Sequence, residues 1–231
     1  MLNWTPATES AAHPLASTDL LPAEAAPTRR EAPEQLVAWF DDVWAGDVAS
    51  VGGKAASLGE MYGRLTHRGV RIPNGFATTV HAWDRMLDAL VPADAWRSID
   101  RDVARIAPAS LQRPTLREAL LDIFGAADAE DELDIHARTG LARALVLATP
   151  IPARVREEIL AAHEHLIEEY GHEVDLAVRS SATSEDSEMA SFAGQYDSYL
   201  NVRGPQHLLT AWRQCCASAF TERAVGYQIR R

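Results

Sequence analysis

Lys54 stands where two glycines meet a predicted helix. It follows Gly52-Gly53 in the stretch VGGKAASLGEMYGRL, residues 51–65. The glycines permit a tight turn or the close approach of a ligand, and the residues after Lys54 are good helix formers. A lysine at a helix N-terminus opposes the helix dipole, whereas a bound phosphate would satisfy both the lysine and the backbone N–H groups. The spacing is not that of a P-loop. The pattern therefore permits a phosphate site or an ordinary glycine turn that carries an exposed lysine.

A second candidate cation, Arg179, ends an alternating apolar run that begins at Leu176. A loop rich in hydroxyl and acidic residues follows, and a second strand-like run covers residues 196–202. An arginine that a strand end delivers into a loop of small residues suits a polyphosphate, because guanidinium and loop N–H groups both bind phosphate oxygens. This stretch predicts one wall of a nucleotide pocket. The alternative is an ion pair between Arg179 and Glu185 or Asp186.

Three hydroxyl residues, Ser180, Ser181 and Thr183, come directly after Arg179 or close to it. Short hydroxyl side chains shape loops by bonding to the nearby backbone, and they also contact bound ligands. The sequence leaves both roles open for these three residues.

The elements that must position these residues are short strands and helices. The first ordered element is expected near Glu34, as a strand or a helical turn. Residues 69–79 predict a short strand broken by a Pro-Asn-Gly turn, with Thr78 or Thr79 as the cap of the next helix. Between about residues 94 and 170, apolar spacing predicts helices over 96–106, 111–124, 133–147 and 153–170, which together form a helical insertion. A final helix is expected over residues 206–220.

Length, composition and charge narrow the class of protein. The 231 residues allow one large domain or two small ones, and 47% of them are hydrophobic, which is enough for a core. The net charge of −11 argues against a nucleic-acid or anionic-membrane surface, although a few local cations can still bind ATP. No apolar run approaches the roughly 18 residues of a membrane span, and no secretory signal is present, so the chain is expected in the cytoplasm. Residues 1–33 have the composition of a disordered leader.

The cysteines and histidines give no sign of a metal site. Cys215 and Cys216 are adjacent in an apolar helical stretch, which predicts two buried thiols in a reducing compartment. The histidines near the third and fourth predicted helices do not lie on one helix face at the spacing of metal ligands, since His163 and His165 are two residues apart and point in different directions on a helix. No metal-ligating residue is assigned.

Three motifs in a fixed order resemble a known family. They are VGGKAASLGEM at residues 51–61, GVRIPNGFATT at 69–79, and AVRSSATSEDSEMASFAGQYDSYLNVRG at 177–204. Together they resemble the N-terminal nucleotide-binding part of phosphoenolpyruvate synthase (pyruvate, water dikinase), and more distantly pyruvate phosphate dikinase and rifampicin phosphotransferase. The resemblance covers about residues 36–231. It implies an α/β (α+β) fold of ATP-grasp type, of which residues 34–231 would be the N-terminal part and therefore an incomplete grasp fold.

The resemblance also implies roles for particular residues. Lys54 and Arg179 match the family's lysine and arginine that grip the ATP phosphates, so both are expected to be catalytic as well as ATP-binding. Ser180, next to Arg179, is included among the expected ATP-binding residues. The loop that carries Gly194, Gln195 and Ser198 matches the glycine-rich loop that covers the phosphates. Ser198 is more often threonine in relatives, a change that keeps the hydroxyl group.

The resemblance implies a reaction that needs more than this sequence. In the family, ATP, pyruvate and water become phosphoenolpyruvate, AMP and phosphate through a phosphohistidine on another domain. The Mg²⁺ ligands, the histidine and the pyruvate site are expected outside these residues, for instance on a separate polypeptide. Two alternatives stay open, a non-catalytic nucleotide-binding module or truncated remnant, and a phosphotransferase that acts on an antibiotic or another small acceptor.

Overall fold

The computed structural model describes residues 34–96, 114–125, 127–128, 131–183 and 197–229. The expected leader, the expected helix over 96–106, Gly194, Gln195 and the alternative partners Glu185 and Asp186 therefore lie outside the described residues, apart from Trp96. The elements are β1 (Val37–Trp39), a 3-10 turn η1 (Ala45–Asp47), α1 (Val48–Val51), α2 (Gly53–Thr66), β2 (Phe76–Thr78), α3 (Val80–Leu87), α5 (Leu116–Gly125), α6 (Glu132–Ala148), α7 (Ala153–Tyr170), β3 (Leu176–Arg179), β4 (Ser198–Val202), α8 (Gly204–Ser218) and α9 (Glu222–Ile229).

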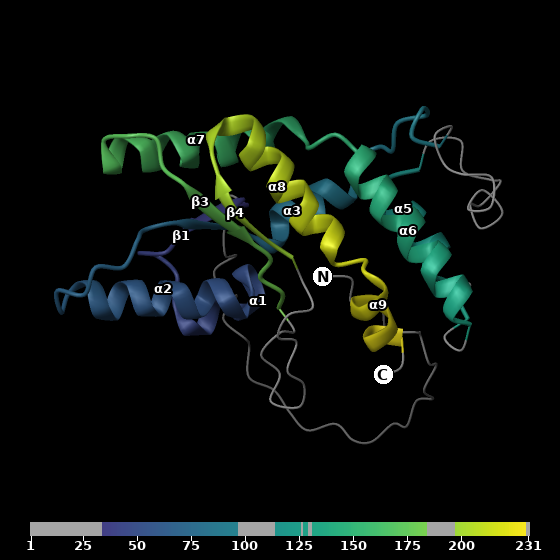
Figure 1. Ribbon diagram of the computed structural model, residues 1–231, viewed down its shortest axis with the longest axis horizontal. Coiled ribbons are helices and arrows are strands. Elements are labelled where there is room, and N and C mark those ends of the chain that lie inside the picture. Colours follow the sequence, from purple (N-terminus) through teal and green to yellow (C-terminus); the bar gives the residue numbers. More distant parts are fainter. Residues whose placement is uncertain (1–33, 97–113, 126, 129–130, 184–196, 230–231) are drawn as a thin grey trace, which may run out of the picture.

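Helices and two small sheets give the described part of the chain a mixed α/β character (Figure 1). On one side of the molecule the strands cross between α2 and α7, and on the other side lie α5, α6 and α9. Helix α8 lies between the two sides and contacts α6, α7, β3 and β4. None of the described helices is long and apolar enough to cross a membrane.

Each sheet is one antiparallel pair of strands. In the first, Val37 of β1 lies opposite Thr78 of β2. In the second, Arg179 of β3 lies opposite Ser198 of β4. The register of this pair shifts by one residue farther along, and Asn201 in β4 has a φ of 55°, in the left-handed region that accompanies a bulge of this kind. The regular end of the pair is therefore the end that carries Arg179 and Ser198.

Two groups of buried apolar side chains hold the elements together. The larger core joins α3, α5, α6, α7 and α8 through residues such as Met86, Leu120, Leu145, Ile159 and Trp212. The smaller core contains Ala38, Val43, Val51, Ala55 and Ala56, so α2 is fixed through alanines that allow close packing. The nucleotide-site candidates lie on elements from both cores, since α2 belongs to the smaller one and β3, β4 and α8 to the larger one.

Most of the expected helices are confirmed. The helices expected over 133–147 and 153–170 appear as α6 and α7, and the first ordered element is a strand, β1. The helix expected over 111–124 appears as α5, which begins at Leu116. The helix expected over 206–220 appears as α8, which begins and ends two residues earlier, and α9 follows it. The periodic apolar spacing of these segments was sufficient to predict the helices, because it reflects the one buried face of each helix.

The strand expected on the N-terminal side of the Pro-Asn-Gly turn, over residues 69–72, was wrong, and the Val70 N–H donates to the Leu65 carbonyl of α2 at 3.1 Å. The break expected at the turn is confirmed, because Pro73 has no N–H group and the Asn74 N–H donates to the hydroxyl of Tyr170 at 2.7 Å. Only β2 is a strand. For the helix cap expected at Thr78 or Thr79, the position was right and the expected side-chain contact was wrong. Thr79 holds the N-cap position of α3, but its hydroxyl donates to the carbonyl of Gln35 at 2.6 Å.

Candidate functional site

The helix that carries Lys54 begins where the chain beyond Arg179 contacts it. Lys54 is the second residue of α2 and is partly buried, and Gly52 is the N-cap with a φ of 81°. The N–H of Gly53 donates to the carbonyl of Ala182 at 3.1 Å, and the N–H of Ala55 donates to the Ser181 hydroxyl at 3.0 Å. The predicted position of Lys54 at a helix N-terminus is confirmed. The expectation that a phosphate would satisfy these amides was wrong for Gly53 and Ala55, since loop atoms already accept from both.

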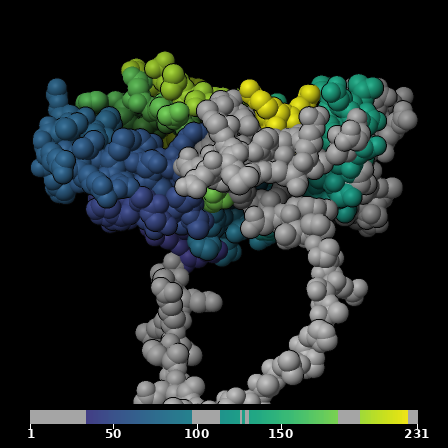
Figure 2. Space-filling view, turned by 90° about the horizontal axis from the view of Figure 1, so that it is seen from below, coloured from purple at the N-terminus to yellow at the C-terminus, as the bar shows by residue number. Residues whose placement is uncertain are grey.

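Gly52 allows this contact because it has no side chain. A Cβ atom at that position would lie 2.3 Å from the Ser181 carbonyl oxygen and 2.5 Å from its hydroxyl. The positive φ is also one that other residues rarely adopt. The glycines that precede Lys54 therefore serve a close approach, and the group that approaches is another segment of the same chain. In Figure 2 a small green part of the surface lies against the blue and purple surface of the α1–α2 region.

Arg179 ends β3 with an exposed side chain. Its Nε donates to the hydroxyl of Ser198, the opposite residue on β4, at 3.3 Å. Within the described residues no carboxylate forms an ion pair with Arg179. The Ser180 hydroxyl oxygen is buried and has no hydrogen-bond partner among these residues, although Ser180 follows Arg179 directly. A buried hydroxyl without a partner loses hydrogen-bonding energy, so this position can accept a further polar group.

Cys215 of α8 lies beneath the ends of both strands. Its thiol is 3.7 Å from the carbonyl oxygen of Val178 and 4.0 Å from that of Asp197. Burial and then the charge of Asp197 raise the pKa of the Cys215 thiol to about 12, and the Lys54 ammonium opposes this rise. Neither Cys215 nor Cys216 forms a disulfide; of the two thiols expected to be buried, Cys215 belongs to a buried residue and Cys216 to a partly buried one. The hydrogen bonds from Gly53 and Ala55 to Ala182 and Ser181 place the start of α2 near the end of β3.

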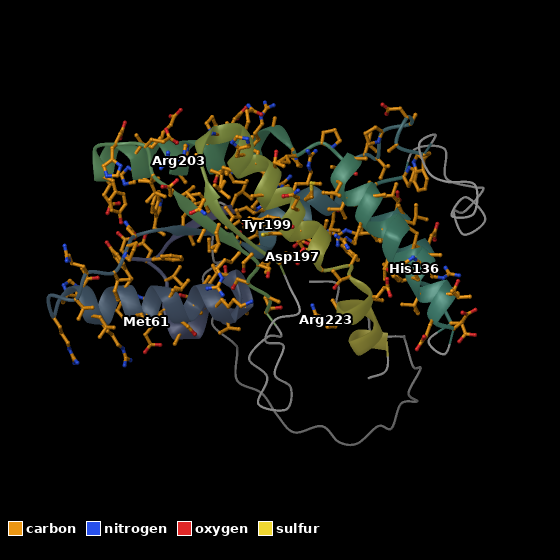
Figure 3. All side chains as sticks on the ribbon, viewed as in Figure 1. Met61, His136, Asp197, Tyr199, Arg203 and Arg223 are labelled. Carbon is orange, nitrogen blue, oxygen red and sulfur yellow. The ribbon has the colours of Figure 1, made fainter. Side chains whose placement is uncertain are left out.

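Asp197 and Tyr199 were not among the residues expected at the site. The Tyr199 hydroxyl donates to the Asp197 carboxylate at 3.3 Å, and both side chains lie beside α8 (Figure 3). Burial and the Asp197 charge raise the pKa of Tyr199 to about 12, against an opposing effect of Arg143. The signal available in the sequence was their position on either side of Ser198. Both residues fall within the strand-like run expected over residues 196–202, and the sequence assigned neither of them a role at the site.

Of the six expected site residues, the structure pairs Arg179 with Ser198, and Ser180 follows Arg179 in the chain. Lys54 lies at the start of the helix that Ser181 and Ala182 contact. Gly194 and Gln195 lie outside the described residues. Ser181, for which the sequence left two roles open, contacts the backbone of α2.

Two further features of the described residues bear on ligand binding. Within these residues no group of three or more His, Cys, Asp or Glu side chains could hold a metal ion. A shallow hollow of about 540 Å³ is lined by Thr66, Arg71, Pro73, Tyr170 and their neighbours. It lies at the C-terminal end of α2, whereas Lys54 is at the N-terminal end, so the hollow is separate from the Lys54 region.

Comparison with known proteins assigns the family. Residues 48–231 match the family model described as pyruvate phosphate dikinase, AMP/ATP-binding domain. Similar relatives include phosphoenolpyruvate synthases from Synechocystis sp. (39% identical over 84% of this chain), Helicobacter pylori (35% over 85%) and Pyrococcus furiosus (33% over 85%). This chain covers 21%, 21% and 25% of these relatives, respectively. The resemblance carried by the three motifs is confirmed, and the chain belongs to the pyruvate phosphate dikinase AMP/ATP-binding domain family.

Proposed function

We propose that this chain binds ATP with its phosphates between Lys54 and Arg179, as the nucleotide-binding portion of a phosphoenolpyruvate synthase-like phosphotransferase. The observation that carries the proposal is the direct contact between the start of α2 and the chain after Arg179, through Ser181 and Ala182. This contact links the helix start that carries Lys54 to the segment that follows Arg179, which supports a site between two cations in an otherwise acidic chain.

The chemistry of the two cations suits a polyphosphate. The guanidinium of Arg179 uses Nε for Ser198, and a guanidinium has further N–H donors with which to bind phosphate oxygens. The Lys54 ammonium adds a compact positive charge. Phosphoryl transfer depends mainly on positioning and on neutralising charge, and these two groups supply part of both.

The wider activity is part of the same proposal. The relatives are named phosphoenolpyruvate synthases, and the corresponding reaction converts ATP, pyruvate and water into phosphoenolpyruvate, AMP and phosphate through a phosphohistidine. The histidine, the acceptor site and the Mg²⁺ ligands would lie in parts of the protein beyond these residues or on a partner polypeptide. The two small sheets would belong to an ATP-grasp type fold, with residues of about 94–170 as a helical insertion.

Calorimetric titration with ATP tests the binding proposal. Lys54→Ala and Arg179→Ala should each weaken ATP binding by about 1.5–3 kcal/mol, a factor of roughly 10 to 150 in Kd, because each removes a charged hydrogen bond to phosphate. Arg64→Ala is a matched control, since Arg64 is an exposed cation at the other end of α2 and pairs with Glu60. Equal ATP affinity in all four proteins would contradict the proposed site.

A further inference from the structure

Ser181 makes a cap of an unusual kind for α2. A helix N-cap is normally the residue that precedes the helix, and its side chain binds the N–H two or three residues on. The preceding residue here is Gly52, which has no side chain to do this. The hydroxyl that accepts from Ala55 instead belongs to Ser181, 126 residues away in the sequence and two residues beyond Arg179.

A second bond acts in parallel with this cap. The N–H of Gly53 donates to the Ala182 carbonyl at 3.1 Å, so adjacent loop residues hold the first and third residues of α2. Lys54 is the residue between them. The missing Cβ of Gly52 leaves the space into which the Ser181 backbone and hydroxyl fit. The contact therefore fixes the backbone of Lys54 relative to the end of β3.

We propose that Ser181 is a positioning residue for phosphate binding, which sets the spacing between Lys54 and Arg179 without itself being required to touch the nucleotide. This inference rests on the proposed ATP site. An in-sequence cap would stabilise α2 without relating it to β3. A cap supplied by the segment after Arg179 stabilises the helix and aligns the two cations in one contact.

The first experiment compares Ser181→Ala with Thr115→Ala by thermal unfolding and by titration with ATP and AMP. Thr115 is the matched control because its hydroxyl accepts from the N–H of Glu118 at the start of α5, which lies away from Lys54 and Arg179. Both variants should lower the Tm by a few degrees, since both remove a helix cap. Only Ser181→Ala should raise the Kd for ATP, by about fivefold to tenfold. It should raise the Kd for AMP less, because AMP has no β- or γ-phosphate for two spaced cations to grip.

A double-mutant cycle then separates positioning from direct contact. If Ser181 acts through Lys54, adding Ser181→Ala to Lys54→Ala should change the Kd for ATP by less than twofold, because the group being positioned is already gone. Full additivity of the two substitutions would overturn the inference. The inference would also be overturned if Ser181→Ala and Thr115→Ala bound ATP with equal affinity while Lys54→Ala and Arg179→Ala bound it more weakly than the unmodified chain. If those two cation variants bind ATP normally, the proposed ATP site itself fails, and the inference fails with it.

Discussion

Arg179 and Ser198 face each other across the antiparallel pair β3–β4, and the guanidinium Nε of Arg179 donates to the Ser198 hydroxyl at 3.3 Å. The two residues are 19 positions apart in the sequence. Ser198 thus restrains the guanidinium through Nε, and the two Nη groups carry the further N–H donors of the side chain. Under the proposed function, a residue expected from the resemblance to cover the phosphates also orients the arginine that grips them.

Removing the Ser198 hydroxyl should weaken ATP binding modestly. Ser198→Ala should raise the Kd for ATP about threefold to tenfold, since the arginine loses one neutral-to-charged hydrogen bond that restrains it. Ser198→Thr keeps the hydroxyl and should bind ATP like the unmodified chain. Calorimetric titration distinguishes the two, and equal Kd values for Ser198→Ala and Ser198→Thr would count against an orienting role.

Gly52→Ala should destabilise the fold by about 2–4 kcal/mol. The new Cβ would strike the Ser181 carbonyl at 2.3 Å, and alanine would also have to adopt a φ of 81°. Urea unfolding measures the change in the free energy of unfolding. Gly69→Ala is the matched control, because Gly69 has a φ of 80° but no atom within 4 Å of the added Cβ. It should cost only about 1 kcal/mol. Similar losses in both variants would show that the contact with Ser181 is not tight.

The Cys215 thiol should be nearly inert in the folded chain. Burial and Asp197 raise its pKa from 9.0 to about 12, so at pH 8 only about one thiol in ten thousand is ionised in the folded state, against about one in ten in the unfolded state. Labelling with iodoacetamide, located by mass spectrometry, should therefore be at least about 100-fold slower at Cys215 in the native chain than in urea. Rapid labelling of the native protein would contradict the buried position beneath β3 and β4.

The same thiol should make stability fall at high pH. Because its folded pKa is raised, the unfolded chain loses this proton first, and stability present below pH 9 declines as the pH rises toward about 12. Cys215→Ala should reduce the steepness of this decline in urea unfolding between pH 9 and pH 11. If the free energy of unfolding of Cys215→Ala fell with pH as steeply as that of the unmodified chain, the decline would come from other titratable groups.

Arg138→Met should lower stability without affecting ATP. The Arg138 side chain is largely buried and donates to the Asp134 carboxylate at 2.6 Å and to the Ile123 carbonyl at the end of α5. Its loss leaves a largely buried carboxylate without its cation, which should cost about 2–4 kcal/mol in urea unfolding at pH 7. The Kd for ATP should not change, because this pair joins α5 to α6 away from Lys54. The exposed pair of Arg64 and Glu60 serves as the control, and Arg64→Met should cost less than about 1 kcal/mol.

This pair should also give acid sensitivity of a defined sign. The hydrogen bond from Arg138 holds the pKa of Asp134 below its usual 3.8, so the stabilisation is present above about pH 4 and is lost as the pH falls through the lowered pKa. In Arg138→Met this loss of stability at low pH should shrink or change sign, because burial then raises the pKa of Asp134 and only the backbone hydrogen bond from Asp128 opposes it. Circular dichroism during acid titration follows the unfolding of the unmodified chain and of Arg138→Met. The assignment would be contradicted if the two acid unfolding curves, each normalised to its signal at pH 7, were identical.

The local sequence pattern was enough to predict several helices and strands, because the interactions that form these elements are themselves local. The apolar spacing of α6 and α7 reflects one buried face of each helix, and their bounds follow from the sequence to within a residue. The start of α2 at the glycines is equally local, as is the ending of β3 at Arg179. The conformation of residues 69–72 could not be predicted in the same way, because the Val70 N–H that a strand would use donates to the Leu65 carbonyl of α2.

By itself, the sequence placed a lysine at a helix start and an arginine at a strand end, the two cations of the proposed site, and supplied three motifs whose order identifies the family. Only the tertiary structure decided what occupies the start of that helix. The amides of Gly53 and Ala55 donate to Ala182 and Ser181, residues that no spacing rule connects with Gly52. The physical reason is that a hydrogen bond depends on distance in space, whereas sequence periodicity reports only on neighbours along one helix or strand.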